Sequence, residues 1–222
     1  NINGFSLPFG KQEYVLTYEI VKPSITVEYP FGGETLVPGD VENIRWDAYG
    51  TNGNNFKIEY STDNGALWIP IDTNVAAANR VYSWTVPATV TNNALIKVSA
   101  KNTALADESD FKFSVIGRPV VTTTKVCTGA VELKWNTIAG ATSYDIMQLV
   151  TDSMQVINTT TDTSFILTGL NKYTNYWLGV RAKNGTVGGR RSLSVSVTPN
   201  AGACTLAVFN NDIKVDSILE PN

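Results

Sequence analysis

The residues that could carry out chemistry are scarce. The chain of 222 residues contains no histidine and only 2 cysteines. Without imidazole, neither a Ser-His-Asp nor a Cys-His nucleophile can be assembled, and zinc sites that depend on histidine are excluded. Two cysteines are too few for a four-thiolate metal site, although they can form one disulfide. We therefore expect no catalytic residue, no cofactor and no metal, and no enzyme activity of this chain itself.

The densest acidic cluster comprises Asp107, Glu108 and Asp110. Carboxylate oxygens are ligands that calcium prefers, so a calcium site is one interpretation. The spacing matches no calcium-loop pattern, and a solvated loop is the simpler interpretation. The glycine-rich stretch 185–189 joins two expected strands rather than opening a helix, which argues against a phosphate loop. It predicts a mobile hairpin tip with Arg190 and Arg191 at its base.

The overall charge and hydrophobicity exclude further classes of partner. There are 17 Lys and Arg residues against 20 Asp and Glu residues, for a net charge of −3. This balance gives no excess of positive charge, which nucleic-acid binding requires. The longest purely apolar runs, such as 75–78, are far too short to cross a bilayer. We expect neither nucleic-acid binding nor membrane insertion.

The elements that must position any site are strands. Apolar residues recur with period two in many short runs separated by Asn, Asp, Gly, Thr and Pro, and no window sustains a helical period. The expected strands are 25–29, 41–48, 55–61, 67–71, 80–86, 95–100 and 111–115, then 120–124, 131–135, 144–150, 155–158, 164–167, 176–182 and 193–197. Two sets of seven predict an all-β chain of two tandem immunoglobulin-like sandwiches.

The two sandwiches are expected to have partial domains on either side. We assign 24–116 and 118–199 to the sandwiches, with Trp46 and Trp84 facing the core of the first. Residues 1–22 contain one alternating strand, 14–21, which would close a preceding domain because a lone strand is not stable. Residues 204–222 are expected to begin a following β domain. The linker 116–119 is short and contains Pro119, which predicts limited freedom between the sandwiches.

Four segments of the second module are distinctive: 133–135 (LKW), 140–144 (GATSY), 170–176 (LNKYTNY) and 181–185 (RAKNG). Together they closely resemble a fibronectin type III domain. The resemblance implies that Trp135 fills the core and that Tyr176 forms a tyrosine corner, with its hydroxyl bonded to backbone near Leu170. We interpret these aromatic residues as core, not as a binding site.

The first module contains the segments 29–34, 44–46, 58–65 and 82–87. Together they look like the immunoglobulin-like domain of yeast Kre9/Knh-type wall proteins and of many secreted bacterial proteins. In the stretch 61–68, Ser61, Asp63, Gly65 and Trp68 resemble the Asp-box of sialidases, with Leu67 where Thr is usual. The motif is a hairpin turn in which Asp63 accepts backbone hydrogen bonds and Gly65 takes a positive φ. In the proteins that carry this motif it is structural, which disfavours a catalytic Asp63.

The paired modules resemble accessory segments of large secreted or surface proteins of Bacteroidota, many of which leave the cell by type IX secretion. Residues 211–222 resemble the opening of a CARDB-type adhesion-related domain. In a fibronectin-type sandwich Cys127 and Cys204 belong to the same pole, so a Cys127–Cys204 disulfide is expected, in an oxidising compartment. Ser153 and Ser217 follow aspartate in patterns similar to Bacteroidota O-glycosylation sites; ordinary turn serines are the alternative.

Several functions remain open at this point. The leading hypothesis is a non-catalytic spacer and interaction segment of a secreted or cell-surface protein, with other domains of the same polypeptide as partners. The modules could instead trail a subtilisin-like peptidase, which is an analogy only. A carbohydrate-binding module using Tyr49, Trp68 or Trp177 is another possibility. A secretion substrate bound to an outer-membrane translocon is the last.

Overall fold

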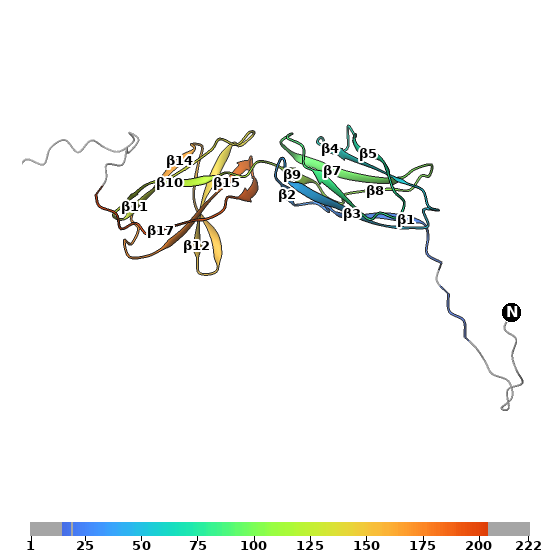
Figure 1. Cartoon of the computed structure of the whole chain (residues 1–222), viewed down its shortest axis with the longest axis horizontal. Coiled ribbons are helices and arrows are strands. Elements are labelled where there is room, and N and C mark those ends of the chain that lie inside the picture. The colour runs from blue at the N-terminus through green and yellow to red at the C-terminus, as the bar shows by residue number, and fades with distance from the viewer. Residues whose placement is uncertain (1–14, 19, 204–222) are drawn as a thin grey trace, which may run out of the picture.

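The computed structural model describes residues 15–18 and 20–203, and every regular element in that part of the chain is a β-strand. The strands form two β-sandwiches, one after the other along the chain (Figure 1). The all-β tandem-sandwich prediction is therefore confirmed. No helix in the described residues is long and apolar enough to span a membrane.

The first sandwich has two facing sheets. Its strands are β1 (Ser24–Tyr29), β2 (Thr35–Leu36), β3 (Val41–Tyr49), β4 (Phe56–Ser61), β5 (Ile69–Val75), β6 (Val81–Thr85), β7 (Thr91–Ala100), β8 (Ala106–Glu108) and β9 (Phe113–Val115). One sheet has the order β1-β3-β6, and the other β2-β9-β7-β4-β5 with β8 beside β7. All pairings are antiparallel except that of β2 with β9.

Aromatic side chains fill the space between these two sheets. Trp46 on β3 is buried and meets Phe56 on β4 in a T-shaped contact, with ring centroids 5.4 Å apart. Trp84 on β6 meets Phe113 on β9 in the same manner at 6.5 Å. Edge-to-face pairs of this kind stabilise a core beyond the area they bury. The period-two alternation of β3, which buries Ile44 and Trp46, supplies this inner face.

The second sandwich repeats this plan with different strands. They are β10 (Val121–Cys127), β11 (Ala130–Trp135), β12 (Ser143–Val150), β13 (Ser153–Thr160), β14 (Ser164–Leu167), β15 (Tyr176–Asn184), β16 (Val187–Arg191) and β17 (Val195–Val197). One sheet is β10-β11-β14 and the other is β13-β12-β15-β16, with β17 also on β15. Trp135 lies in the core, 5.5 Å from Tyr144 between ring centroids.

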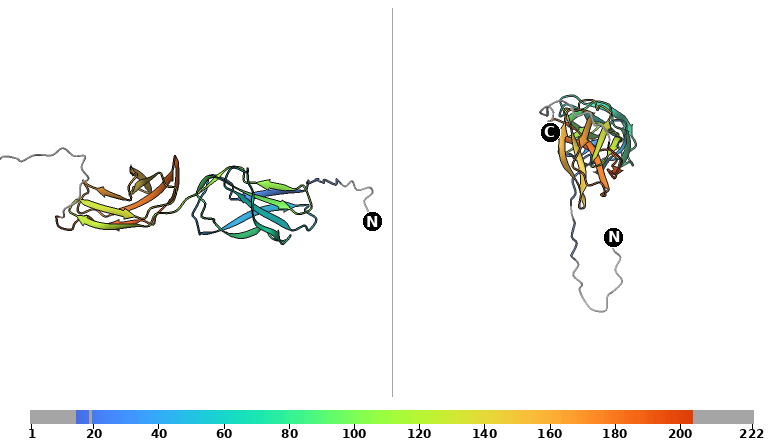
Figure 2. Two further views of the ribbon diagram at one scale, coloured as in Figure 1. Left: turned by 90° about the horizontal axis from the view of Figure 1, so that it is seen from above. Right: turned by 90° about the vertical axis from the view of Figure 1, so that its left-hand side faces the viewer.

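The sandwiches lie end to end along the long axis of the molecule. All three views agree on this arrangement, because the rod seen from the side in Figures 1 and 2 becomes a compact outline when viewed along its axis. The N-terminal residues leave the first sandwich at the end away from the second (Figure 1). In the described part of the chain the two sandwiches therefore meet at one junction, which contains residues 115–120 and the loops and strands that pack beside them.

Two sequence expectations need correction, and a third stays a prediction. The described residues of the expected strand 14–21, namely 15–18, 20 and 21, are exposed and form no strand with the described part of the chain, and that this segment closes a preceding domain stays a prediction. The expected strand 67–71 begins only at Ile69, since the residues before it belong to a turn. The expected hairpin tip 185–189 is shorter than predicted: Gly185 and Thr186 form the turn, and the rest of the stretch belongs with Arg190 to strand β16. The proposed following domain at 204–222 lies outside the described residues.

Candidate functional site

The junction between the sandwiches is the best-defined candidate for a functional feature. Val115, at the end of β9, belongs to the first core and is 1% exposed, whereas the next residue, Ile116, belongs to the second core and is 0% exposed. Two consecutive residues thus anchor different domains. Side chains buried in a close-packed interior have little freedom, so no flexible residue separates the two cores.

Strand β16 brings a cation to the first sandwich. The Arg190 guanidinium donates from Nη2 to Glu42 Oε1 at 2.7 Å and from Nε to the Thr35 carbonyl at 2.8 Å. In return Thr35 Oγ1 donates to the Gly188 carbonyl at 3.2 Å. Asp40 lies 3.9 Å from Arg190 Nη1. A guanidinium that donates in two directions fixes orientation as well as distance.

Close packing also holds the junction together. Val90, from the loop between β6 and β7, packs against the second core. A Cβ atom placed on Gly140 would lie 2.7 Å from Val90 Cγ1, so only glycine allows this approach. Gly189 makes the same kind of approach to Ile116, at 2.8 Å. Nearby, Asn92 Nδ2 donates to the Asn184 carbonyl at 3.1 Å.

A tyrosine extends the polar part of the junction into the first sandwich. Tyr29 Oη donates to Glu42 Oε2 at 2.9 Å, so Glu42 accepts from both Tyr29 and Arg190. Burial, and then the hydrogen bond to Glu42, raise the pKa of Tyr29 to about 12. Beside it lies an open depression of about 520 Å³, lined by Glu28, Tyr29, Val41, Glu42, Asn43 and Arg45. Of its lining residues, Tyr29 and Glu42 are bonded to each other and, through Arg190, to the second sandwich, whereas Glu28 and Arg45 are exposed.

The Asp-box-like turn is closed by its aspartate. Asp63 Oδ1 accepts from the Leu67 N–H at 2.9 Å and from Ser61 Oγ at 2.7 Å. The bond from the Leu67 backbone, and then the one from Ser61, lower the pKa of Asp63. Gly65 has φ +81°, and its position lies over the ring of Trp68. These contacts all lie within one exposed turn.

The four aromatic residues assigned to the cores lie in or against them. Trp46, Trp84 and Trp135 are buried, while Tyr176 is partly buried against the second core. Tyr176 Oη accepts from the Asn171 N–H at 2.9 Å, next to Leu170. This bond ties the loop before β15 to the strand itself.

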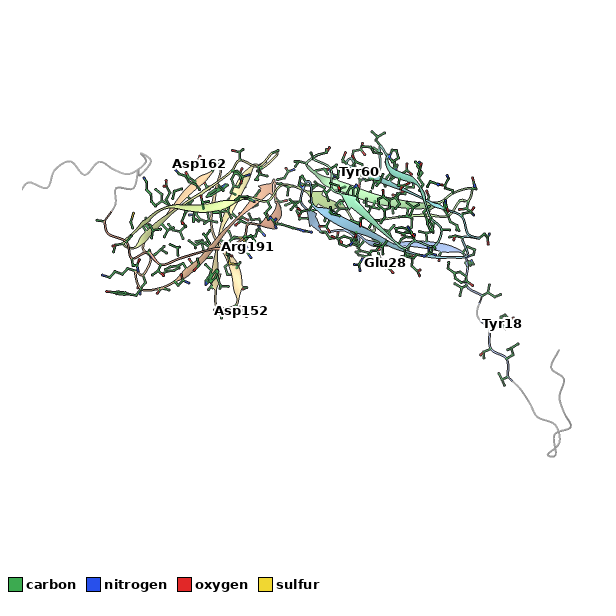
Figure 3. The ribbon with its side chains drawn as sticks, viewed as in Figure 1. Tyr18, Glu28, Tyr60, Asp152, Asp162 and Arg191 are labelled. Carbon is green, nitrogen blue, oxygen red and sulfur yellow. The ribbon has the colours of Figure 1, made fainter. Side chains whose placement is uncertain are left out.

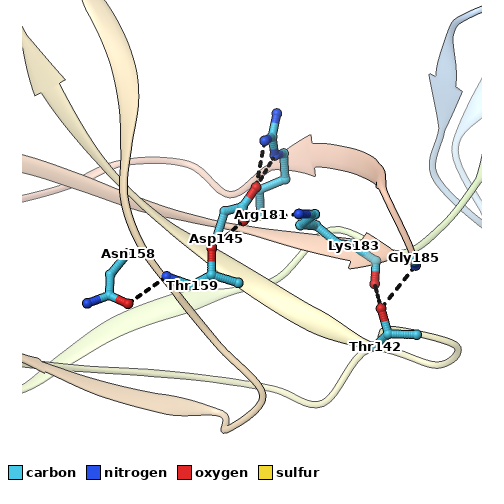
Figure 4. Close-up of polar contacts among 7 residues, drawn as sticks. All are labelled: Thr142, Asp145, Asn158, Thr159, Arg181, Lys183 and Gly185. Carbon is cyan, nitrogen blue, oxygen red and sulfur yellow. Dashed lines mark hydrogen bonds and ion pairs between the residues drawn. The ribbon is translucent and has the colours of Figure 1, made fainter.

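A buried ion pair on the second sandwich was missed by the sequence analysis. Asp145 on β12 is 2% exposed and receives Arg181 Nη2 at 2.6 Å and Nε at 3.1 Å (Figure 4). Thr159 Oγ1 donates to its other oxygen at 2.9 Å, and Lys183 Nζ is 3.7 Å away. The register Asp145↔Arg181 across β12 and β15 creates the pair. The signal in the sequence was an aspartate inside an apolar strand.

The acidic cluster is spread over structural contacts. Asp107 Oδ2 accepts from the Val27 N–H at 2.8 Å, which links β8 to β1 of the opposite sheet. Glu108 pairs with Lys97 at 3.0 Å. Asp110 is exposed. Within the described residues, no group of three or more His, Cys, Asp or Glu residues is placed to hold a metal ion.

The residues proposed for covalent modification are only partly described. Cys127 is buried at the end of β10, rather than in the turn that follows, and Ser153 is exposed at the start of β13. Cys204 and Ser217 lie outside the described residues. Of the rings proposed for sugar binding, Tyr49 is 55% and Trp177 46% exposed, whereas Trp68 is partly buried with Lys97 Nζ 4.9 Å from its ring centroid.

Comparisons with known proteins find similarity only among solved structures. No protein-family model and no curated protein matches the chain. A two-domain fibronectin type III segment of chicken tenascin is 12% identical and covers 79% of this chain and 98% of its own length, with a TM-score of 0.47. The FN1–FN3 domains of chicken CNTN1 are 15% identical over 79% of this chain and 64% of that one, at 0.34. The fold class stated above follows from the sheets of the chain itself.

Proposed function

We propose that this chain is a non-catalytic spacer and interaction segment that holds neighbouring parts of a larger protein at a fixed separation. The observation that carries the proposal is the burial of Val115 and Ile116 in two different cores. Domains joined by exposed, flexible residues move relative to one another by default. Here the connection itself is core, and Arg190 and Val90 bind the two sides of the junction. The described residues form a short, stiff rod.

Small-angle X-ray scattering on matched variants tests this proposal. Arg190→Ala removes the bonds to Glu42 and Thr35, whereas Arg191→Ala removes a neighbouring guanidinium that bonds only to Ser192 and Ser194 of its own sandwich. We expect Arg190→Ala to broaden the interdomain distance distribution and Arg191→Ala to leave it unchanged. A wild-type distance distribution as broad as that of two independently moving sandwiches would refute the rigid spacer.

We propose that the chain is secreted or lies at the cell surface, and that a Cys127–Cys204 disulfide forms in that oxidising environment. The turn after Cys127 is bonded to the segment that precedes Cys204: Thr128 Oγ1 donates to the Ala201 carbonyl at 2.5 Å, and the Gly129 N–H to the Pro199 carbonyl at 3.0 Å. These bonds support the pairing by bringing the two parts of the chain together. Peptide mapping without reduction tests it, because the linked peptide pair is expected only if the bond forms.

The finer context remains a proposal from resemblance. We propose that the first module is related to the Kre9/Knh-like immunoglobulin-like domains and that the whole belongs to a Bacteroidota protein exported by type IX secretion, with a subtilisin-like peptidase as one candidate for the parent's catalytic domain. In that setting Ser153, which is exposed, is an O-glycosylation site. A hexose-containing mass increment on the peptide around Ser153 from the native host supports this context, and cross-linking to an outer-membrane protein supports a bound secretion substrate.

A carbohydrate-binding role is the second candidate, because exposed aromatic rings are sugar platforms when they face solvent. Trp177 on β15 and Tyr49 on β3 present such rings. Glycan-array binding that is lost in Trp177→Ala or Tyr49→Ala supports this role. Tyr173→Ala is the matched control, since Tyr173 is also exposed but lies in a loop. An array without any binding would refute this role.

A further inference from the structure

Asparagine followed by glycine is the dipeptide at which a protein chain most readily modifies itself. The glycine nitrogen attacks the asparagine side-chain amide, and no Cβ atom on glycine hinders the approach. The sequence has four such pairs, at 3–4, 52–53, 64–65 and 184–185. The first pair lies outside the described residues. The other three differ in their local contacts, and these contacts decide which of them is open to the reaction.

In two of the described pairs a hydrogen bond holds the attacking nitrogen. The Gly65 N–H donates to Ser61 Oγ at 2.8 Å, inside the Asp-box-like turn. The Gly185 N–H donates to Thr142 Oγ1 at 3.0 Å, beside the paired strands β12 and β15 (Figure 4). The nitrogen must lose its proton and turn towards the asparagine side chain before it attacks. A hydrogen bond from that N–H opposes both steps, because it is lost when they occur.

The third pair, Asn52 and Gly53, lacks this protection. The Gly53 N–H makes no hydrogen bond within the described part of the chain, and both residues are exposed. They lie in the turn between β3 and β4, with φ of +54° at Asn52 and +72° at Gly53. Asn64 and Gly65 have nearly the same φ angles, +62° and +81°. These two pairs are thus similar in φ and differ in the hydrogen bond of the glycine N–H.

The turn that contains Asn52 is held only by local bonds. Asn54 donates to the Thr51 carbonyl from its backbone N–H at 3.1 Å and from Nδ2 at 2.9 Å. The turn at Asn64 is in addition tied to β7, because the Asn64 N–H donates to the Asn93 carbonyl at 2.9 Å. Exposed turns with few bonds to the rest of the fold open at the lowest free energy. Ring closure at Asn52 therefore meets both a free nitrogen and a weakly held backbone.

We propose that Asn52 is converted spontaneously to isoaspartate and aspartate in the folded chain, and that the fold directs this reaction to Asn52 rather than to Asn64 or Asn184. A bond forms between Gly53 N and Asn52 Cγ while the bond from Cγ to the side-chain nitrogen breaks. That nitrogen leaves as ammonia, with the proton lost from the Gly53 amide. Water then opens the succinimide ring at either of its carbonyl carbons, which gives the two products. Each product carries a new carboxylate.

The reaction alters the end of the rod at which the chain enters the first sandwich. Gly50 lies close to Pro23 there, since a Cβ atom on Gly50 would be 2.9 Å from Pro23 Cγ. Figure 3 shows Tyr18, which precedes Pro23, beyond this end and away from the second sandwich. Isoaspartate adds a carbon to the backbone of the turn, and both products make the net charge of −3 more negative. The inference is independent of the spacer role, which rests on the junction with the second sandwich.

Peptide mapping by mass spectrometry, on the full folded chain incubated at physiological temperature and pH, tests the proposal. Each conversion raises the mass of a peptide by about 1 Da, and chromatography separates the isoaspartyl form from the aspartyl form. We expect Asn52 to convert at least about tenfold faster than Asn64 and Asn184, the factor that corresponds to one hydrogen bond. In denaturant the three rates should become similar, because the fold no longer distinguishes the sites. Asn52→Gly, which suits the positive φ, is the control that removes the signal.

Two variants test whether the hydrogen bonds are the cause of the selectivity. Ser61→Ala and Thr142→Val each remove the hydroxyl that accepts a glycine N–H. Each is expected to speed conversion about tenfold at its own asparagine and to leave the rate at Asn52 unchanged. Native-state hydrogen exchange on the wild type is a second measure, with fast exchange expected for the Gly53 amide and slow exchange for the Gly65 amide. Equal rates at the three sites of the folded chain, or an Asn52 that stays intact while the denatured chain converts, overturns the proposal.

Discussion

The two sandwiches build their cores in the same way but secure their surfaces differently. In each, a buried tryptophan meets another ring edge to face: Trp46 with Phe56, and Trp135 with Tyr144. Neither indole Nε1 has a hydrogen-bond partner, so both residues act through shape and apolar area. Their polar contacts outside the aromatic core differ. The first sandwich uses the carboxylate of Asp63 to close a turn, whereas the second uses the phenol of Tyr176 to hold a loop and the buried Asp145–Arg181 ion pair to join two strands. Equivalent cores therefore need not have equivalent responses to charge and pH.

The largest expected effect tests the equivalence of the two cores. Trp46→Ala and Trp135→Ala should each lower the free energy of unfolding of its own sandwich by about 3–5 kcal/mol, because a large buried ring is replaced by a cavity. Urea unfolding followed by circular dichroism should show an earlier transition in either variant. Trp177→Ala, at a half-exposed site, is the control, with little change expected. A small loss of stability at one buried tryptophan and a large loss at the other would show that the two cores are not equivalent.

A smaller loss of stability is expected when the buried Asp145–Arg181 ion pair of the second sandwich is broken. Arg181→Met leaves the buried Asp145 with Thr159 and Lys183 alone. Because loss of a partner exposes the desolvation cost of a buried charge, we expect a loss of about 1–3 kcal/mol, measured by the same urea titration. Lys172→Met changes an exposed cation of the same sandwich and should have almost no effect. Equal stability of the two variants would show that solvent already screens Asp145.

The tyrosine corner should contribute less again. Tyr176→Phe keeps the ring against the core and removes only the oxygen that accepts the Asn171 N–H. The expected loss in unfolding free energy is about 1 kcal/mol, typical of one hydrogen bond. Tyr173→Phe, at an exposed ring, is the matched control. A Tyr176→Phe variant as stable as the wild type would mean that water replaces the phenol oxygen.

The smallest effect, and the one that separates the sandwiches by pH, concerns Asp63. Its pKa is lower in the folded chain than the ordinary value of 3.8, so the folded state favours the carboxylate. That stabilisation is present above the ordinary pKa and disappears as the pH falls through the lowered one. Asp63→Asn should thus be slightly less stable than the wild type near neutral pH and equally stable in strong acid. A stability difference that does not change with pH would exclude the charge as its cause.

The sequence predicted what depends on local pattern and missed what depends on distant pairing. Alternation around Trp46 and Trp135 was enough for the sandwiches. Arg190 was assigned to the base of a mobile tip, because its partner Glu42 lies 148 residues away and only the junction brings them together. Asp145 was missed for the same reason, since its partner Arg181 belongs to another strand. The strand expected before Pro23 has no partner among the described residues, and an alternating pattern forms a strand only where another strand is available, so its place in a preceding domain stays a prediction.

The central claim is that the two sandwiches form one rigid body. Residual dipolar couplings of backbone amides, measured on the weakly aligned wild-type chain, test this claim most directly. Couplings from 24–115 and from 120–198 are fitted separately to alignment tensors. The account predicts that both sets give one tensor of the same magnitude and orientation, since Val115 and Ile116 anchor adjacent backbone in both cores. Two tensors of clearly different magnitude would show that the sandwiches reorient independently and would contradict the rigid spacer.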